Sequence, residues 1–128
     1  MPKTINWPLQ CFDAVRTTSD ESIQMAVRLG TLYFEHQYWV AGDVVDIRVN
    51  SEVIRSAEIV GEMKSCAIRD LSPSDVLCFK PNYQSHEGIV SFLQTTYPDK
   101  HAEHPITLDT IVSVVYYKNQ PVLDSVVL

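Results

Sequence analysis

The chain has 128 residues, of which 45% are hydrophobic and 20% charged, and its formal net charge is −6. A chain of this length buries about two-thirds of the surface that it exposes when unfolded, so we expect one domain over residues 1–128. The ten basic residues are scattered and are outnumbered by sixteen acidic ones, which argues against binding of long duplex nucleic acid, since that interaction usually needs clustered lysines and arginines.

Neither a membrane segment nor a cysteine framework is predicted. No stretch approaches the roughly 18 apolar residues of a membrane span, and residues 1–7 lack the apolar run of a secretory signal. We therefore expect a cytoplasmic protein without a membrane partner. Cys11, Cys66 and Cys78 are widely spaced and form no CxxC pair, so we expect reduced, partly buried thiols and neither disulfides nor a zinc site.

Several strands are predicted in the first half of the chain. An N-terminal helix or turn is followed by an aromatic-rich segment, 33–40, which favours a strand. Residues 45–49 alternate aliphatic and charged side chains, residues 50–52 form a turn, and 53–63 alternate again, so this region predicts a hairpin. The second strand is long and contains Gly61, which favours a bulge and a curved sheet.

The second half predicts two short helices and a closing strand. Ser72 is a typical N-cap, followed by Pro73 at the first helical position and Asp75 three residues after the cap. A second helix is expected to begin at 85–87 and to stop at Tyr97-Pro98. Residues 106–117 are rich in β-branched and aromatic side chains, which indicates a central strand. The expected class is α+β, with a small curved sheet or barrel and two helices inserted before the last strand.

This pattern resembles the ASCH domains of the PUA-like superfamily over about residues 10–118. The matching segments are Val27-Arg28, 42–47, 70–72, 92–98 and 110–117. The resemblance implies a small β-barrel with a cleft beside the helices, and recognition of RNA, a nucleotide or a modified nucleoside. On this basis we interpret the chain as a non-catalytic PUA-like binding module.

Some ASCH proteins resemble amidohydrolases that act on acylated cytidine, with a Lys and a Thr shortly before the aliphatic-Arg pair. This sequence has Ile23 and Ala26 at those positions. Neither side chain can act as a nucleophile or a base, so no catalytic residue is predicted. An enzyme that uses Lys80 with a carboxylate such as Glu35 or Asp75 remains the alternative.

Four residues are candidates for ligand binding: Arg28, Tyr33, Trp39 and Lys80. Arginine suits a phosphate or a base edge, and aromatic rings can stack on bases. Lys80 lies in the loop predicted between the two helices, where a lysine could assist Arg28. Each residue also has an alternative, structural interpretation. In it Arg28 forms an ion pair, the two aromatic rings lie in the core, and Lys80 lies on the surface.

A pair of histidines follows the second predicted helix. His101 and His104 are three residues apart and lie between prolines, which does not match a zinc motif, so we expect a solvated loop, no metal and no cofactor.

Residues 121–128 are apolar for a terminus and predict an added edge strand or a covered groove. A second copy of the chain is therefore one expected partner, in a homodimer formed through this tail. A protein-interaction module that uses the tail is a third interpretation of the function.

Overall fold

The predicted hairpin forms the middle of the sheet. In the computed structural model, which describes residues 3–121, β3 (Val44–Val49) pairs antiparallel with β4 (Glu52–Ile59). The turn between them contains Asn50 and Ser51, whose φ angles are 52° and 69°, as primed hairpin turns require. The register shifts between Ile47 and Arg48, so the bulge lies inside the hairpin and not near Gly61, as the sequence had suggested.

Gly61 instead separates two strands where the sequence predicted one. Its φ of +92° is a conformation that glycine adopts without steric cost. The chain leaves β4 at Ile59 and re-enters the sheet as β5 (Lys64–Ala67). Both strands pair with β6 (Ile111–Asn119), β4 near the end of β6 and β5 near its beginning. The strand predicted over 53–63 therefore ends at Ile59, and β5 begins only after residue 63.

The six-stranded sheet is curved but is not closed by hydrogen bonds. The order is β1-β3-β4-β6-β2, with β5 also on β6. β1 (Lys3–Trp7) is parallel to β3, and β2 (Gln24–Leu29) is antiparallel to β6. These two strands end the sheet, and within residues 3–121 no pairing joins them. The α+β class is confirmed, whereas a closed barrel is not formed by this strand order.

Three α-helices lie between β5 and β6, one more than predicted. A 3-10 turn, η2 (Ile68–Asp70), leads to α3 (Pro73–Leu77), where Ser72 and Asp75 form the expected capping box. Helix α4 (His86–Thr96) follows, with Ser85 as its N-cap. Pro98 then begins a further helix, α5 (Pro98–Glu103), because proline is tolerated in a first helical turn. The loop predicted around His101 is therefore wrong.

Two N-terminal expectations are also corrected. The chain starts with β1 before it forms η1 (Leu9–Cys11) and α1 (Phe12–Thr17). The aromatic segment expected as a strand instead forms α2 (Leu32–Glu35) and a turn at Gln37, whose φ is 47°. Aromatic content favoured a strand, but here the rings pack against one another across a helix and a turn.

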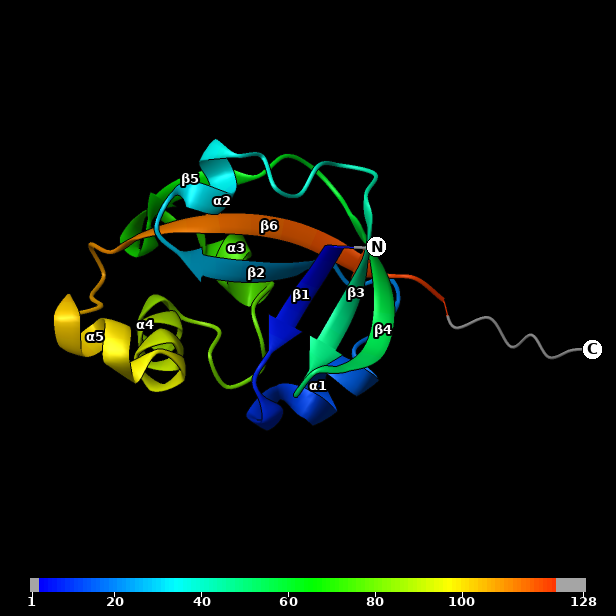
Figure 1. Cartoon of the computed structure of the whole chain (residues 1–128), viewed down its shortest axis with the longest axis horizontal. Coiled ribbons are helices and arrows are strands. Elements are labelled where there is room, and N and C mark those ends of the chain that lie inside the picture. The colour runs from blue at the N-terminus through cyan, green and yellow to red at the C-terminus, as the bar shows by residue number, and fades with distance from the viewer. Residues whose placement is uncertain (1–2, 122–128) are drawn as a thin grey trace, which may run out of the picture.

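Helices α4 and α5 lie at one end of the molecule, beside the end of β2, and α1 lies below β3 and β4 (Figure 1). Trp39, Tyr117, Ile5 and Met25 are among the largest fully buried side chains. Cys66 and Cys78 are half-buried, as predicted, whereas Cys11 is fully buried. None of the helices in residues 3–121 has the length and hydropathy needed to cross a bilayer. The apolar tail after Pro121 lies outside the described residues, so the homodimer stays a prediction.

Candidate functional site

Arg28 bridges the two ends of the open sheet. From β2, its guanidinium donates to the carbonyl of Val27 at 3.0 Å and to the carbonyl of Asn6 in β1 at 2.9 Å. The ion pairs found in residues 3–121 do not include Arg28. The structure therefore does not support the alternative in which Arg28 forms an ion pair. Its guanidinium is positioned by backbone carbonyls, and no carboxylate among residues 3–121 pairs with it.

A pocket of about 270 Å³ surrounds this guanidinium. It combines two cationic and two phenolic side chains from three segments, which are β2, α2 and the start of α5. Its lining consists of Asn6, Arg28, Leu29, Tyr33, Tyr97 and Lys100. We call it the Arg28 pocket. Tyr97 and Lys100 were missed by sequence reasoning, because they join the site only through the placement of α5, which was expected to be a loop.

Tyr33 is a surface ring supported by the core. It is 38% exposed and stacks on Trp39 with 5.0 Å between ring centroids and an interplanar angle of 8°. Trp39 itself is 2% exposed, so it supports Tyr33 from behind and does not line the pocket. Tyr33 also borders an apolar pocket of about 330 Å³ that includes Leu32, His36 and Tyr38.

Lys80 is not part of the Arg28 pocket. It lies in the loop between α3 and α4, as expected, but is only 3% exposed. Its Nζ donates to Gln24 Oε1 at 2.9 Å and to the Tyr117 hydroxyl at 3.3 Å, and lies 4.3 Å from the centroid of the Trp7 ring. Burial lowers the pKa of Lys80 to about 8. The structure therefore corrects both the hypothesis that Lys80 assists Arg28 in the cleft and the alternative that it is a surface lysine.

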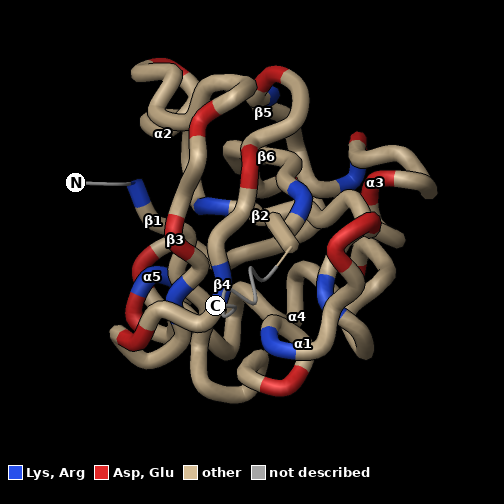
Figure 2. Tube along the Cα trace, turned by 90° about the vertical axis from the view of Figure 1, so that its right-hand side faces the viewer, with Lys and Arg blue, Asp and Glu red and all other residues tan. Residues whose placement is uncertain are grey.

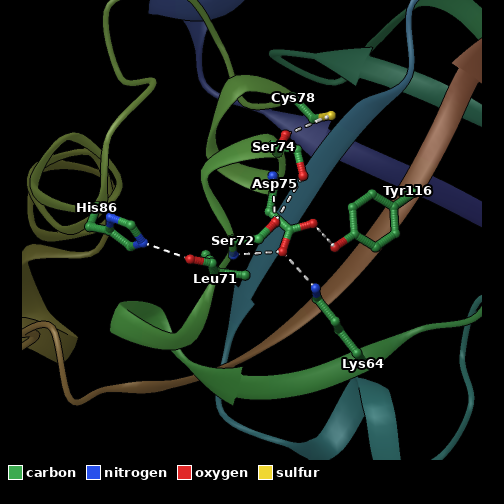
Figure 3. A network of polar contacts seen from close by, with 8 residues as sticks. All are labelled: Lys64, Leu71, Ser72, Ser74, Asp75, Cys78, His86 and Tyr116. Carbon is green, nitrogen blue, oxygen red and sulfur yellow. Dashed lines mark hydrogen bonds and ion pairs between the residues drawn. The ribbon is translucent and has the colours of Figure 1, made fainter.

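A separate polar network joins α3 to the sheet (Figure 3). Asp75 accepts hydrogen bonds from Lys64 Nζ at 2.7 Å, from the Tyr116 hydroxyl at 2.7 Å and from the backbone N–H of Ser72 at 2.9 Å. Burial opposes ionisation of Asp75, but these bonds outweigh it and hold the pKa of Asp75 well below its usual value. Burial raises the pKa of Tyr116 to about 12.

The charge states of this network argue against general acid–base catalysis. An efficient acid or base has a pKa near the working pH, whereas Asp75 is held ionised and the pKa of Lys64 is raised. Burial works against the ammonium of Lys64, but its hydrogen bond to Asp75 and the nearby Tyr116 favour the charged form. The arrangement is that of a structural clamp between α3, β5 and β6.

The pairs proposed for the alternative enzyme do not form. Lys80 makes no ion pair or hydrogen bond with Glu35 or Asp75 within residues 3–121: Glu35 accepts from the Thr31 hydroxyl, and Asp75 pairs with Lys64. No group of three or more potential metal ligands occurs in the described part of the chain.

Charge is distributed unevenly between pockets, although basic and acidic residues are interspersed along the trace (Figure 2). A roomier pocket of about 720 Å³ includes Asp20, Glu21 and Glu58 with one lysine, Lys118. Carboxylates repel phosphate, so this pocket suits a nucleic-acid ligand poorly. The Arg28 pocket has the opposite composition, since both of its charged side chains are cationic.

Comparisons with protein-family models and with curated proteins found no match. Among solved structures, an ASCH domain from Lactobacillus crispatus JV V101 is similar with a TM-score of 0.55 and 13% identity, over 75% of this chain and 63% of that one. The chain thus spans less than two thirds of that structure. Protein EF3133 from Enterococcus faecalis V583 is similar with a TM-score of 0.66 and 11% identity, over 94% of this chain and 77% of that one. At these identities the likeness concerns the fold alone, and it confirms that this chain has an ASCH-like fold.

Proposed function

We propose that this protein is a non-catalytic binding module that recognises a nucleotide or a short single-stranded RNA segment in the Arg28 pocket. The observation that carries the proposal is an arginine held in place by two carbonyls, without a carboxylate partner among the described residues, in a pocket that also contains Lys100 and two tyrosines. The ASCH-like fold supports it, because that family is linked to RNA binding.

The side chains of the pocket divide recognition between phosphate and base. A guanidinium has five N–H donors, and the two carbonyl bonds leave others free for a phosphate or a base edge. Lys100 adds a second positive charge. The exposed ring of Tyr33, held by its stacking on Trp39, offers a rigid platform for one base.

Pocket size limits the ligand. A volume of about 270 Å³ is slightly below the roughly 300–1,000 Å³ of typical small-molecule sites. A base with its neighbouring phosphate suits such a site, whereas a long duplex does not. The acidic charge of the whole chain works in the same direction, since strong binding to duplex DNA draws on many phosphate contacts.

The test is a titration of ¹⁵N-labelled protein, followed by amide NMR at low salt, with a mixture of nucleoside monophosphates and then with a hexanucleotide RNA. We expect saturable shifts clustered at Arg28, Tyr33, Tyr97 and Lys100. Lys100→Ala, an exposed change, should weaken binding. Arg69→Ala removes an exposed arginine that pairs with Asp109 and should leave binding unchanged.

Two outcomes would overturn the proposal: no shifts at millimolar ligand, or equal weakening by the Lys100→Ala and Arg69→Ala variants. The same sample, incubated with an acylated cytidine, separates a binder from an enzyme. We expect no deacylation, and turnover that depends on Lys80 would favour the amidohydrolase alternative instead.

A further inference from the structure

Lys80 and Gln24 form an incompletely satisfied polar pair inside the molecule. Lys80 is 3% exposed and Gln24 is 5% exposed. None of the ion pairs in residues 3–121 includes Lys80, so its ammonium is bonded only to the uncharged oxygens of Gln24 and Tyr117. Gln24 Nε2 is buried and has no hydrogen-bond partner in the structure. Burying an unpaired charge or a free donor is costly, and both occur here at one place.

A small pocket reaches this pair from the surface. Its volume is about 150 Å³, and it lies between the start of β2 and the loop that joins α3 to α4. Ile23 and Leu77 are exposed members of its lining, whereas Gln24, Phe79 and Lys80 are buried members. Because Gln24 and Lys80 are buried members of the lining, the pair lies on the inner side of this pocket.

We propose that this pocket binds a short-chain carboxylate, whose oxygens accept hydrogen bonds from Lys80 Nζ and Gln24 Nε2. Two donors match the two oxygens of a carboxylate. One positive charge matches a monoanion, whereas a phosphate dianion would leave excess negative charge in a buried site. The apolar side chains of Ile23, Leu77 and Phe79 suit an aliphatic chain.

Volume and charge both restrict the ligand further. The pocket has room for about five water molecules at roughly 30 Å³ each, which suits a chain of two to four carbons and excludes a nucleotide. Burial also lowers the pKa of Lys80 to about 8, and a bound anion would reverse that effect by favouring the ammonium. This site is separate from the Arg28 pocket and does not depend on the function proposed for it.

The probes are sodium butyrate and sodium acetate, with sodium chloride at equal ionic strength and butanol as controls. Amide NMR of the labelled protein is expected to show saturable shifts at Gln24 and at residues 77–81 with butyrate, but not with chloride or butanol. The ¹³Cε signal of Lys80 should show a raised pKa in the presence of butyrate. An unchanged Lys80 pKa, or shifts that chloride reproduces, would overturn the proposal.

Gln24→Glu supplies a built-in carboxylate at the position of Oε1, 2.9 Å from Lys80 Nζ. We expect this variant to melt at a higher temperature than the parent and to lose its response to butyrate. Gln10→Glu makes the same charge change at an exposed residue and should alter neither property. Lys80→Met removes the ammonium and should remain folded without binding butyrate. Parent-like butyrate binding in a folded Lys80→Met or Gln24→Glu variant would contradict the assignment.

Discussion

Arg28 has a structural role as well as the proposed binding role. Its bond to the Asn6 carbonyl links β2 to β1, the two strands that no pairing joins in the described chain. Lysine keeps the charge but has no planar fork, so Arg28→Lys should lose at least one of the two carbonyl bonds. We expect the free energy of unfolding to fall by about 1 kcal/mol, measured by urea denaturation.

Arg16→Lys is the matched control for this prediction. Arg16 makes an exposed pair with Asp13 at 3.5 Å and lies 5.8 Å from the centroid of the Phe12 ring, and exposed ion pairs contribute about 0–1 kcal/mol. An Arg28→Lys variant as stable as the Arg16→Lys variant would show that the bridge between β1 and β2 contributes nothing measurable.

The buried amine of Lys80 should leave a signature in the pH dependence of stability. The folded protein releases this proton near pH 8 because burial disfavours the ammonium, whereas the unfolded chain retains it to about pH 10.4. Between these values the unfolded state binds more protons, so Lys80 makes the free energy of unfolding rise with pH. The comparison of the parent with Lys80→Met by urea denaturation from pH 7 to 10 isolates this contribution.

Neighbouring groups act in the opposite direction. Burial raises the pKa values of Cys11 and Tyr117, so the unfolded chain loses these protons first and stability falls as the pH rises. For this reason the difference between the two proteins is the quantity to measure. If that difference does not change between pH 7 and 10, Lys80 is not a buried ammonium in the folded state.

At the scale of elements, α3 depends on a single carboxylate. Asp75 completes the capping box with Ser72 and binds Lys64 and Tyr116 (Figure 3). Asp75→Asn removes the charge that these donors stabilise, and we expect a loss of about 1–3 kcal/mol at pH 7, measured by urea denaturation. Asp109→Asn, at an exposed pair with Arg69, should cost less than about 1 kcal/mol.

The same carboxylate should contribute to acid sensitivity. The folded-state pKa of Asp75 is held below its usual value by its donors, against the effect of burial, so the unfolded chain takes up a proton first as the pH falls. The stabilisation is therefore present above about pH 4 and is lost as the pH decreases further. Urea midpoints between pH 2 and 6 should fall more steeply for the parent than for Asp75→Asn, and parallel curves would refute this.

Local signals in the sequence predicted elements well, while contacts between distant segments were missed. The caps at Ser72 and Ser85 act within three residues, so a sequence pattern suffices to find them. β1 pairs with β3 about 40 residues later, and nothing near residue 3 encodes that partner. The aromatic segment 33–40 failed for a related reason, because its rings pack on one another across a turn rather than along a strand.

In the candidate site, too, the residues that are close in the chain were predicted, and those that distant packing brings together were missed. Arg28 and Tyr33 are close in the chain and do line one pocket, but Tyr97 and Lys100 reach it only through the packing of α5 beside β2. The burial of Lys80 was also beyond sequence reasoning, because it depends on Trp7, Gln24 and Tyr117 from three different strands. A lysine is usually exposed, and no pattern around residue 80 indicated the exception.

At the scale of the whole molecule, an acidic chain with a small cationic pocket should bind RNA with a weak dependence on salt. The net charge is −6, and the Arg28 pocket contains two cationic side chains, Arg28 and Lys100. For single strands, log K falls with log salt with a slope of about −0.7 per neutralised phosphate. We therefore expect a slope of about −1.4, measured by fluorescence anisotropy with a labelled hexanucleotide between 50 and 300 mM KCl.

Lys100→Ala should reduce that slope to about −0.7, because one phosphate contact is lost. Lys118→Ala, a change in the pocket that contains Asp20 and Glu58, should leave it unchanged. A slope steeper than about −3 for the parent would require more phosphate contacts than the Arg28 pocket can supply. Binding would then spread over the surface, and the ligand would be a longer nucleic acid than the one proposed.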